Sequence, residues 1–291
     1  MRKLKLLFPA SSLLILVLLI PVFALSLRLT AHAAEEHGAP TIADAFAGEA
    51  LDYVIGFWFF DNVAEARLSL EKGEKGEYIA RLEAYTTGVI KGIADRRDVY
   101  VARLKLVDNG KRFLTQSFEK SVTMRGKTRR NLTVVDYKKR VVRWRSWGGG
   151  KEEKTGVSNI PPGIYCDDPL AAFYNLRAGV YGPIQEGKEF RMFTFPKGDR
   201  VPEIKVRVAG NAELQEKARK NKYSARSSSF YSPQHLAIAT MGPELFASEG
   251  IDLFFNSSFI PVEAIARDVM LFGDVRGRLT GGTPFKAALQ N

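Results

Sequence analysis

Short runs in which apolar and polar residues alternate recur along this chain, and they constrain its fold more than any other feature. In residues 63–71, Ala64, Ala66, Leu68 and Leu70 occupy every second position, with charged or polar residues between them. Successive side chains of a β-strand point to opposite faces of a sheet, so this pattern indicates a strand with one buried and one solvated face. A solvated face is typical of antiparallel sheets.

Turn signals separate these runs at the spacing of an all-β fold. Asp108-Asn109-Gly110 lies between two such runs and predicts a tight hairpin. We expect about seven short strands before the middle of the chain, and more after it. The hydrophobic content of 45% over 291 residues suffices for a large core. The sequence therefore predicts a mostly β protein: an antiparallel meander that forms a strongly curved sheet or a half-open barrel, with one short central helix.

The central helix is predicted from the residues that follow the turn Pro161-Pro162-Gly163. Asp167 or Asp168 can accept hydrogen bonds from the free N–H groups of a helix start, and Pro169 suits the first helical position because no donor is needed there. We interpret the two aspartates as capping and turn residues, and not as a catalytic carboxylate pair. The predicted structural residues of this turn and helix are Asp167, Asp168, Pro169, Leu170, Phe173 and Tyr174.

The first 33 residues have the organisation of a secretory signal peptide. Arg2, Lys3 and Lys5 precede an apolar run from Leu6 to Leu27, and Ala31-His32-Ala33 supplies a small-x-small cleavage pattern. We expect cleavage after Ala33 and export to the periplasm of a Gram-negative bacterium. The alternative is that residues 6–27 remain as an inner-membrane anchor, because the run is long enough to span a bilayer.

The remaining boundaries follow from composition. Residues 34–47 are small and polar and predict a flexible lead, residues 48–279 a single β-rich domain, and residues 280–291 a tail. Within the domain, residues 211–229 are rich in Lys, Arg and Ser and predict a long loop.

Residues that could carry chemistry are few. Cys166 is the single cysteine, which excludes an intramolecular disulfide, and His235 is the one histidine within the predicted domain that could serve it as a base. We interpret Cys166 as a small buried apolar residue. The sequence contains no cysteine pair or His-x-His motif for a metal, no Gly-x-Ser-x-Gly motif and no phosphate-binding loop. We expect no enzymatic activity, no cofactor and no metal.

Basic residues are concentrated between positions 125 and 145. Cleavage after Ala33 would lower the formal net charge from +11 to +7, so the exported chain stays mildly basic. The sharper interpretation of the cluster is a patch for an anionic lipid headgroup or envelope polymer, and the alternative is a solvated sheet face. Nucleic acid is not expected as a partner outside the cytoplasm. The patch residues are Arg129, Arg130, Lys138, Arg140, Arg143 and Arg145.

Four consecutive aromatic residues at positions 57–60 make both faces of one predicted strand apolar. A sheet that curls around an incompletely filled interior would form an apolar pocket, as in lipid carriers. The alternative is a close-packed core without a cavity. The candidate pocket residues are Phe57, Trp58, Phe59, Phe60, Phe173 and Phe193.

Three parts of the chain match a known family: the opening strands at residues 49–53 and 63–68, the segment Asp168-Pro169-Leu170-Ala171-Ala172-Phe173-Tyr174-Asn175-Leu176-Arg177, and the closing runs at residues 259–264 and 273–279. On these parts the chain resembles the domain of unknown function 3108 family of exported bacterial proteins. The resemblance implies a periplasmic, β-rich protein, and it supplies no catalytic residues. Asn256-Ser257-Ser258 and the polar stretch 211–229 depart from the family pattern.

Together these features predict a non-enzymatic periplasmic envelope protein that binds a lipid or other apolar ligand in a curved-sheet pocket. The alternative is a structural or scaffolding protein that contacts other envelope proteins and takes no small-molecule ligand.

Overall fold

The computed structural model describes residues 40–57, 60–221, 232–241, 250–269 and 273–283. The chain divides into two compact units, Met1–Pro40 and Thr41–Asn291, and every element below belongs to the second. The predicted signal peptide, residues 34–39 of the predicted lead, and Trp58 and Phe59 lie outside the described residues. None of the helices in the described ranges has the length and hydrophobicity that a membrane-spanning helix requires.

The first half of the second unit is a strand meander. Its elements are α2 (Ile42–Phe46), β1 (Ala50–Phe57), β2 (Phe60–Lys72), β3 (Glu77–Thr86), α3 (Gly88–Ile93), β4 (Arg96–Val107), β5 (Arg112–Met124), β6 (Lys127–Asp136), β7 (Val141–Gly148) and β8 (Lys151–Asn159). The second half contains α4 (Pro169–Arg177), β9 (Glu189–Phe193), β10 (Glu203–Val208), α5 (Asn211–Lys220), β11 (His235–Met241), β12 (Gly250–Phe255), β13 (Pro261–Val269) and β14 (Gly273–Thr283).

All of these strands join one antiparallel sheet of 14 strands, in the order β8-β7-β6-β5-β4-β3-β2-β1-β14-β13-β12-β11-β10-β9. The first and last strands in the chain, β1 and β14, are neighbours in the sheet. Ala50 of β1 lies opposite Ser69 of β2 on one side and Thr283 of β14 on the other. The edges are β8 and β9, so the sheet of described strands is curved but not closed. The predicted fold class is confirmed.

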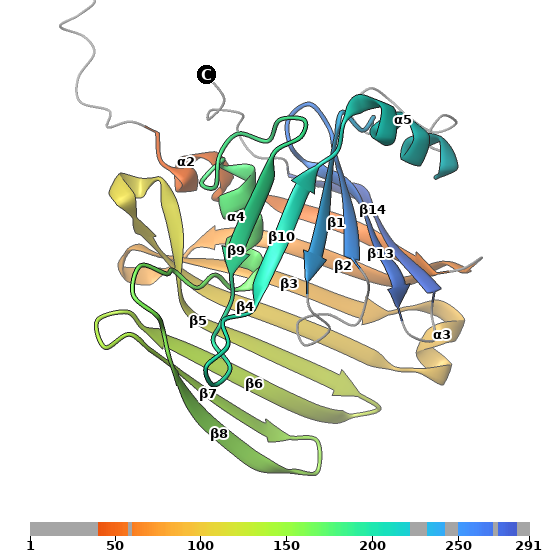
Figure 1. The fold of residues 1–291 in the computed structure, drawn as a ribbon. Helices are drawn as coiled ribbons and strands as arrows, with labels where there is room; N and C mark the ends of the chain where they lie inside the picture. The colour runs from red at the N-terminus through yellow and green to blue at the C-terminus, as the bar shows by residue number, and fades with distance from the viewer. Residues whose placement is uncertain (1–39, 58–59, 222–231, 242–249, 270–272, 284–291) are drawn as a thin grey trace, which may run out of the picture. The chain divides into compact units, whose positions relative to one another are not determined.

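The segment between β8 and β9, residues 160–188, crosses the opening of the sheet and carries α4. Its backbone is attached at both sides: Ile160 N–H donates to Arg140 O at 2.8 Å, and Asp167 N–H donates to Phe193 O at 2.8 Å. Figure 1 shows α4 between the β9–β10 pair in front and strands β3–β5 behind. This segment therefore fixes the distance between the two halves of the curved sheet.

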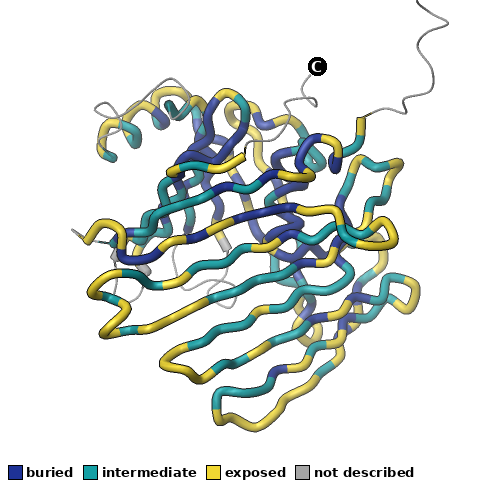
Figure 2. The backbone as a smooth tube through the Cα atoms, turned by 180° about the vertical axis from the view of Figure 1, so that it is seen from behind, coloured by how far each residue is buried: buried dark blue, intermediate teal, exposed yellow. Residues whose placement is uncertain are grey.

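Helix α4 is the centre of the hydrophobic core. Tyr174, which is fully buried, packs in a cluster with Leu104 of β4 and Phe113 of β5. On another side of the helix, Leu176 packs in a second cluster with Val206 of β10. Figure 2 shows buried positions concentrated in the strands nearest this helix, while β6–β8 are mostly intermediate or exposed.

The predicted flexible lead is wrong for residues 41–47. Thr41 and Asp44 form a reciprocal capping box around the start of α2, and Ile42 and Phe46 are 1% and 2% exposed. A short helix of this length is not stable by propensity alone, so packing of its apolar side against the core stabilises it.

The other boundary predictions need three corrections. Residues 211–220 of the predicted long loop form α5, whose Leu214 is buried against the sheet, while residues 222–229 lie outside the description. The predicted tail begins too early, because β14 runs to Thr283 and pairs with β1. The expectation of about seven strands before the middle of the chain missed β8, because its mostly exposed, charged residues do not alternate with apolar ones.

Candidate functional site

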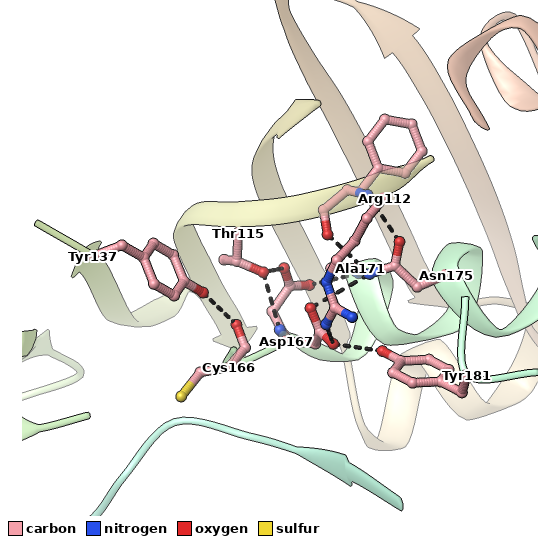
Figure 3. A network of polar contacts seen from close by, with 10 residues as sticks. Arg112, Thr115, Tyr137, Cys166, Asp167, Ala171, Asn175 and Tyr181 are labelled. Atoms are coloured by element: carbon pink, nitrogen blue, oxygen red, sulfur yellow. Dashed lines mark hydrogen bonds and ion pairs between the residues drawn. The ribbon is translucent and has the colours of Figure 1, made fainter. Parts of the chain in front are cut away.

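The predicted central segment forms a buried polar network at the start of α4 (Figure 3). Asp168 is the N-cap residue, and its Oδ1 accepts hydrogen bonds from the N–H groups of Leu170 at 2.8 Å and Ala171 at 3.2 Å. Its Oδ2 accepts from the Thr115 hydroxyl at 2.7 Å. Burial raises the pKa of Asp168 to about 6, although these hydrogen bonds favour its charged form.

Asp167 points the other way and pairs with Arg112 at the start of β5. The guanidinium Nη2 of Arg112 lies 2.5 Å from Asp167 Oδ2, and the Tyr181 hydroxyl donates to the same oxygen. The guanidinium is also flanked by the rings of Tyr165 and Tyr181, at 5.1 and 5.5 Å. Burial raises the pKa of Asp167, and the Arg112 charge opposes this shift.

Asn175 extends the network from α4 to β5. Its Oδ1 accepts from the backbone N–H of Phe113 and its Nδ2 donates to the carbonyl of Phe113, both at 2.9 Å. These two bonds imitate the pairing of a neighbouring strand. The network therefore attaches the crossing segment and α4 to β5.

Cys166 adjoins this network without being activated by it. Burial, with the nearby Asp167 charge, raises the pKa of the thiol to about 12, so the thiol is protonated at neutral pH. Cys166 packs in a cluster with Val135 and Val142, whereas His235 stacks on the ring of Phe259 at 4.4 Å. The geometry gives no pairing of Cys166 with His235.

The described residues of the predicted pocket do not lie together, and Phe60 is 44% exposed, outside the core. The rings of Phe57 and Phe60 are 5.8 Å apart across the β1–β2 turn. Phe173 packs against Tyr174 and lies 5.1 Å from the Arg177 guanidinium, so it helps to fill the interior. Phe193 follows Met192, which is buried in the core, and therefore points to the other face of β9.

A different set of aromatic residues borders the core around α4, where Tyr100 and Phe118 pack against the edge of that core. Tyr100 shares a face of β4 with Ala102 and Leu104, which are fully buried around α4, but Tyr100 itself is half-buried. Opposite positions across the strands continue this face to Phe118 of β5 and Trp144 of β7. We call Tyr100, Phe118, Lys120 and Trp144, together with Arg129 and Lys154 on the same face, the distal inner face.

The side chains of the distal inner face contact one another. The rings of Tyr100 and Phe118 are stacked, with centroids 6.2 Å apart, and the Lys120 ammonium lies 5.2 Å from the Tyr100 centroid. Trp144 lies against Gly156 of β8, where a Cβ atom would come within 2.5 Å of the indole Cε2. Sequence reasoning missed this set, since alternation shows which residues share a face but not which face α4 covers.

The predicted anionic-surface patch is divided among three places. Arg130, Arg143 and Arg145 lie on the outer face of β6 and β7, where Arg145 pairs with Glu153 at 2.7 Å. Arg129 faces inward and donates to the Ser146 hydroxyl at 3.0 Å. Arg140 donates to the carbonyl groups of Ile160, Pro161 and Ile164, so it holds the crossing segment, and Lys138 lies in the β6–β7 turn.

A depression of about 510 Å³ lies on the outer face of β1–β3 and β14. Its charged side chains pair with one another: Arg67 with Asp52 at 2.7 Å and Arg81 with Glu83 at 3.0 Å. The Tyr85 hydroxyl donates to Glu65 at 2.7 Å. Charged side chains thus line this depression, unlike the predicted apolar pocket. In the sequence, the charged positions that alternate with buried ones in these strands indicated such a face.

A match to a family model agrees with the resemblance carried by the sequence. No curated protein matches the chain. A solved structure described as "Crystal Structure of Beta-barrel-like Protein of Domain of Unknown Function DUF1849 from Brucella abortus" is similar, with a TM-score of 0.38 and 12% identity, over 83% of this chain and 100% of that chain. The family model "Protein of unknown function (DUF3108)" matches residues 52–225, more than half of the chain. The predicted relationship is therefore confirmed, and the chain belongs to the DUF3108 family.

Proposed function

We propose that this protein is a non-enzymatic component of the bacterial cell envelope that binds a lipid with an acidic headgroup on its distal inner face. The observation that carries the proposal is the row of half-buried aromatic side chains, Tyr100, Phe118 and Trp144, on the inner face of the sheet at the border of the core around α4. Apolar surface that the chain's own core does not fully cover is typical of binding sites.

The charge on the distal inner face supports an anionic ligand. Lys120, Arg129 and Lys154 occupy inward positions on β5, β6 and β8. The Nη1 atom of Arg129 is buried without a hydrogen-bond partner among the described residues. A buried donor without a partner is unfavourable, so a carboxylate or phosphate oxygen at this point would stabilise it. The aromatic rings would then contact the apolar part of the ligand.

The periplasmic location belongs to the same proposal. It rests on the signal-peptide pattern of residues 1–33. The thiol of Cys166, the one cysteine of the chain, is buried and protonated at neutral pH, which supports a binding role over nucleophilic catalysis.

The experiment compares two tryptophans of one strand. Trp144 lies on the distal inner face, whereas Trp147 lies opposite Arg130 on the outer face. Binding of a fluorescent fatty acid should weaken at least tenfold, about 1.4 kcal/mol, in Trp144→Ala and by less than twofold in Trp147→Ala. Native mass spectrometry of the wild-type protein purified from membranes should show bound lipid. Lipid-free protein that also fails to bind the probe, or equal losses in the two variants, would sink the proposal.

A scaffolding role is the second candidate, and one observation favours it. The edge strand β8 is mostly exposed, and its Val157 is 63% exposed. Exposed edges pair readily with strands of other chains. Cross-linking in intact cells from a cysteine placed at position 157 distinguishes the two roles: a single stoichiometric protein partner supports scaffolding, and its absence beside bound lipid supports ligand binding.

A further inference from the structure

One end of the meander carries a set of exposed apolar side chains that the proposed lipid site does not use. In an antiparallel meander, alternate turns lie at the same end of the sheet, so the β1–β2, β3–β4 and β5–β6 connections are neighbours. Four exposed apolar residues lie there: Phe60 at the start of β2, Val89 and Ile93 in α3, and Met124 at the end of β5, which are 44%, 83%, 63% and 46% exposed. We call these four residues the apolar rim. They are half of the eight large hydrophobic side chains that are exposed in the described ranges.

Hydrogen bonds join the three connections into one continuous structure. Thr87, which precedes α3, donates from its N–H to Val63 O at 2.8 Å and from its hydroxyl to Asn62 O at 3.1 Å. On the other side, Arg125 donates from its N–H to Asp95 O and from its guanidinium to Ile93 O, both at 2.9 Å. Figure 1 shows α3 at the end of the strands away from α2. The apolar rim is therefore held in place by its neighbours.

Basic residues alternate with the apolar ones. Lys91 lies between Val89 and Ile93 in α3, and Lys127 follows Met124 across the β5–β6 turn. Residues 87–97 and 124–127 contain five basic residues and one acidic residue, Asp95. The basic residues are Lys91, Arg96, Arg97, Arg125 and Lys127. Two of them are paired with acids nearby, Arg96 with Asp98 and Arg97 with Glu83, which leaves the positive charge on the lysines and Arg125.

We propose that the apolar rim docks on the surface of an anionic lipid bilayer. Separate apolar tips that project between cations suit the headgroup region, where apolar side chains enter the acyl boundary and lysines reach the phosphates. A protein partner would instead favour a flat, continuous apolar surface with few charges at its centre. The rim and the lipid site share no residue, because the rim lies in α3 and at the strand ends beside it, whereas the distal inner face lies within the strands.

The test uses residues 34–291, the chain that the predicted cleavage after Ala33 would leave, which contains all described elements and lacks the apolar N-terminal run. Co-sedimentation with vesicles of phosphatidylcholine and phosphatidylglycerol in equal parts is compared with pure phosphatidylcholine. The double variant Val89→Ser/Ile93→Ser should bind the mixed vesicles at least tenfold more weakly. The control Val134→Ser/Val157→Ser removes two other exposed valines, 41% and 63% exposed, and should bind within twofold of the wild type.

A second pair of variants tests the contribution of positive charge to vesicle binding. Lys91→Gln/Lys127→Gln should lower binding at least threefold at low salt, whereas Lys75→Gln/Lys111→Gln, at the opposite end of the meander, should not. Circular dichroism and thermal melting show that each variant is folded. Vesicle binding that is equal for rim and control variants, or independent of phosphatidylglycerol, would overturn the proposal. So would a soluble protein that binds the rim while vesicles do not. Val89→Ser/Ile93→Ser should still bind the fluorescent fatty acid within twofold of the wild type, which separates the rim from the lipid site.

Discussion

Glu49 and Arg177, 128 positions apart in the chain, form a bidentate ion pair with both side chains fully buried. The guanidinium nitrogens lie 2.7 and 2.8 Å from the carboxylate oxygens, and Arg177 Nε also donates to Phe259 O at 2.8 Å. The ring of Phe46 lies over the guanidinium at 4.6 Å. One side chain at the end of α4 thus joins the segment before β1 to the turn before β13.

The first prediction concerns this pair. Glu49→Ala leaves a buried guanidinium without its counter-charge and should lower the free energy of unfolding by about 3–5 kcal/mol. Asp52→Ala removes an exposed pair with Arg67 nearby and should cost less than about 1 kcal/mol. Urea unfolding measures both. Similar small losses for the two variants would show that the buried pair does not hold these segments together.

The second prediction concerns Asp168 and pH. Its pKa of about 6 in the folded protein exceeds the ordinary 3.8, so the folded state holds the proton more tightly than the unfolded state. The resulting stabilisation is fully present below about pH 4 and is lost as the pH rises to about 6. At 1.36 kcal/mol per unit, it amounts to at most about 3 kcal/mol.

Asp168→Asn tests this because asparagine also caps helices but does not ionise. The wild type should lose stability relative to this variant between pH 4 and pH 7, by up to about 3 kcal/mol. Urea unfolding at several pH values measures the difference. A stability difference that stays constant over this range would mean that Asp168 titrates as it does in the unfolded chain.

Residues 41–47 provide the third prediction. Phe46 is 2% exposed and packs against Tyr174 with ring centroids 5.5 Å apart. Phe46→Ala should therefore cost about 3–5 kcal/mol, whereas an exposed residue of a flexible lead would cost nothing measurable. Thr41→Ala, which removes the cap of α2, should cost about 1 kcal/mol. A melting temperature unchanged by Phe46→Ala would restore the interpretation of these residues as a lead.

The strands were predictable where a local pattern reflects burial on one face. Residues 63–71 alternate because one face of β2 packs on the core, and Asp108-Asn109-Gly110 forms the β4–β5 turn with positive φ at all three positions. The cap at Asp168 was predictable for the same reason, since a helix start needs an acceptor within two or three residues.

What escaped prediction depends on contacts between distant residues. Arg112 and Asp167 are 55 positions apart, and no local pattern indicates that they pair. The helical state of residues 42–46 comes from packing on α4 and the sheet, because five residues are too few for a stable helix alone. The six residues of the predicted basic patch do not share one surface, because neighbours such as Arg129 and Arg130 point to opposite faces of one strand.

The last prediction uses the close approach of Gly156 to Trp144. A methyl group at Gly156 would lie 2.5 Å from the indole ring, so Gly156→Ala should displace the ring and cost about 1–3 kcal/mol. Gly277→Ala, in β14, is the matched control because no atom lies within 4 Å of its added carbon. If the clash with the indole is the cause, Gly156→Ala should cost almost nothing in a Trp144→Ala background, since contacting residues are not additive. A cost that persists in that background would place the strain in the backbone of β8 and not in the position of Trp144.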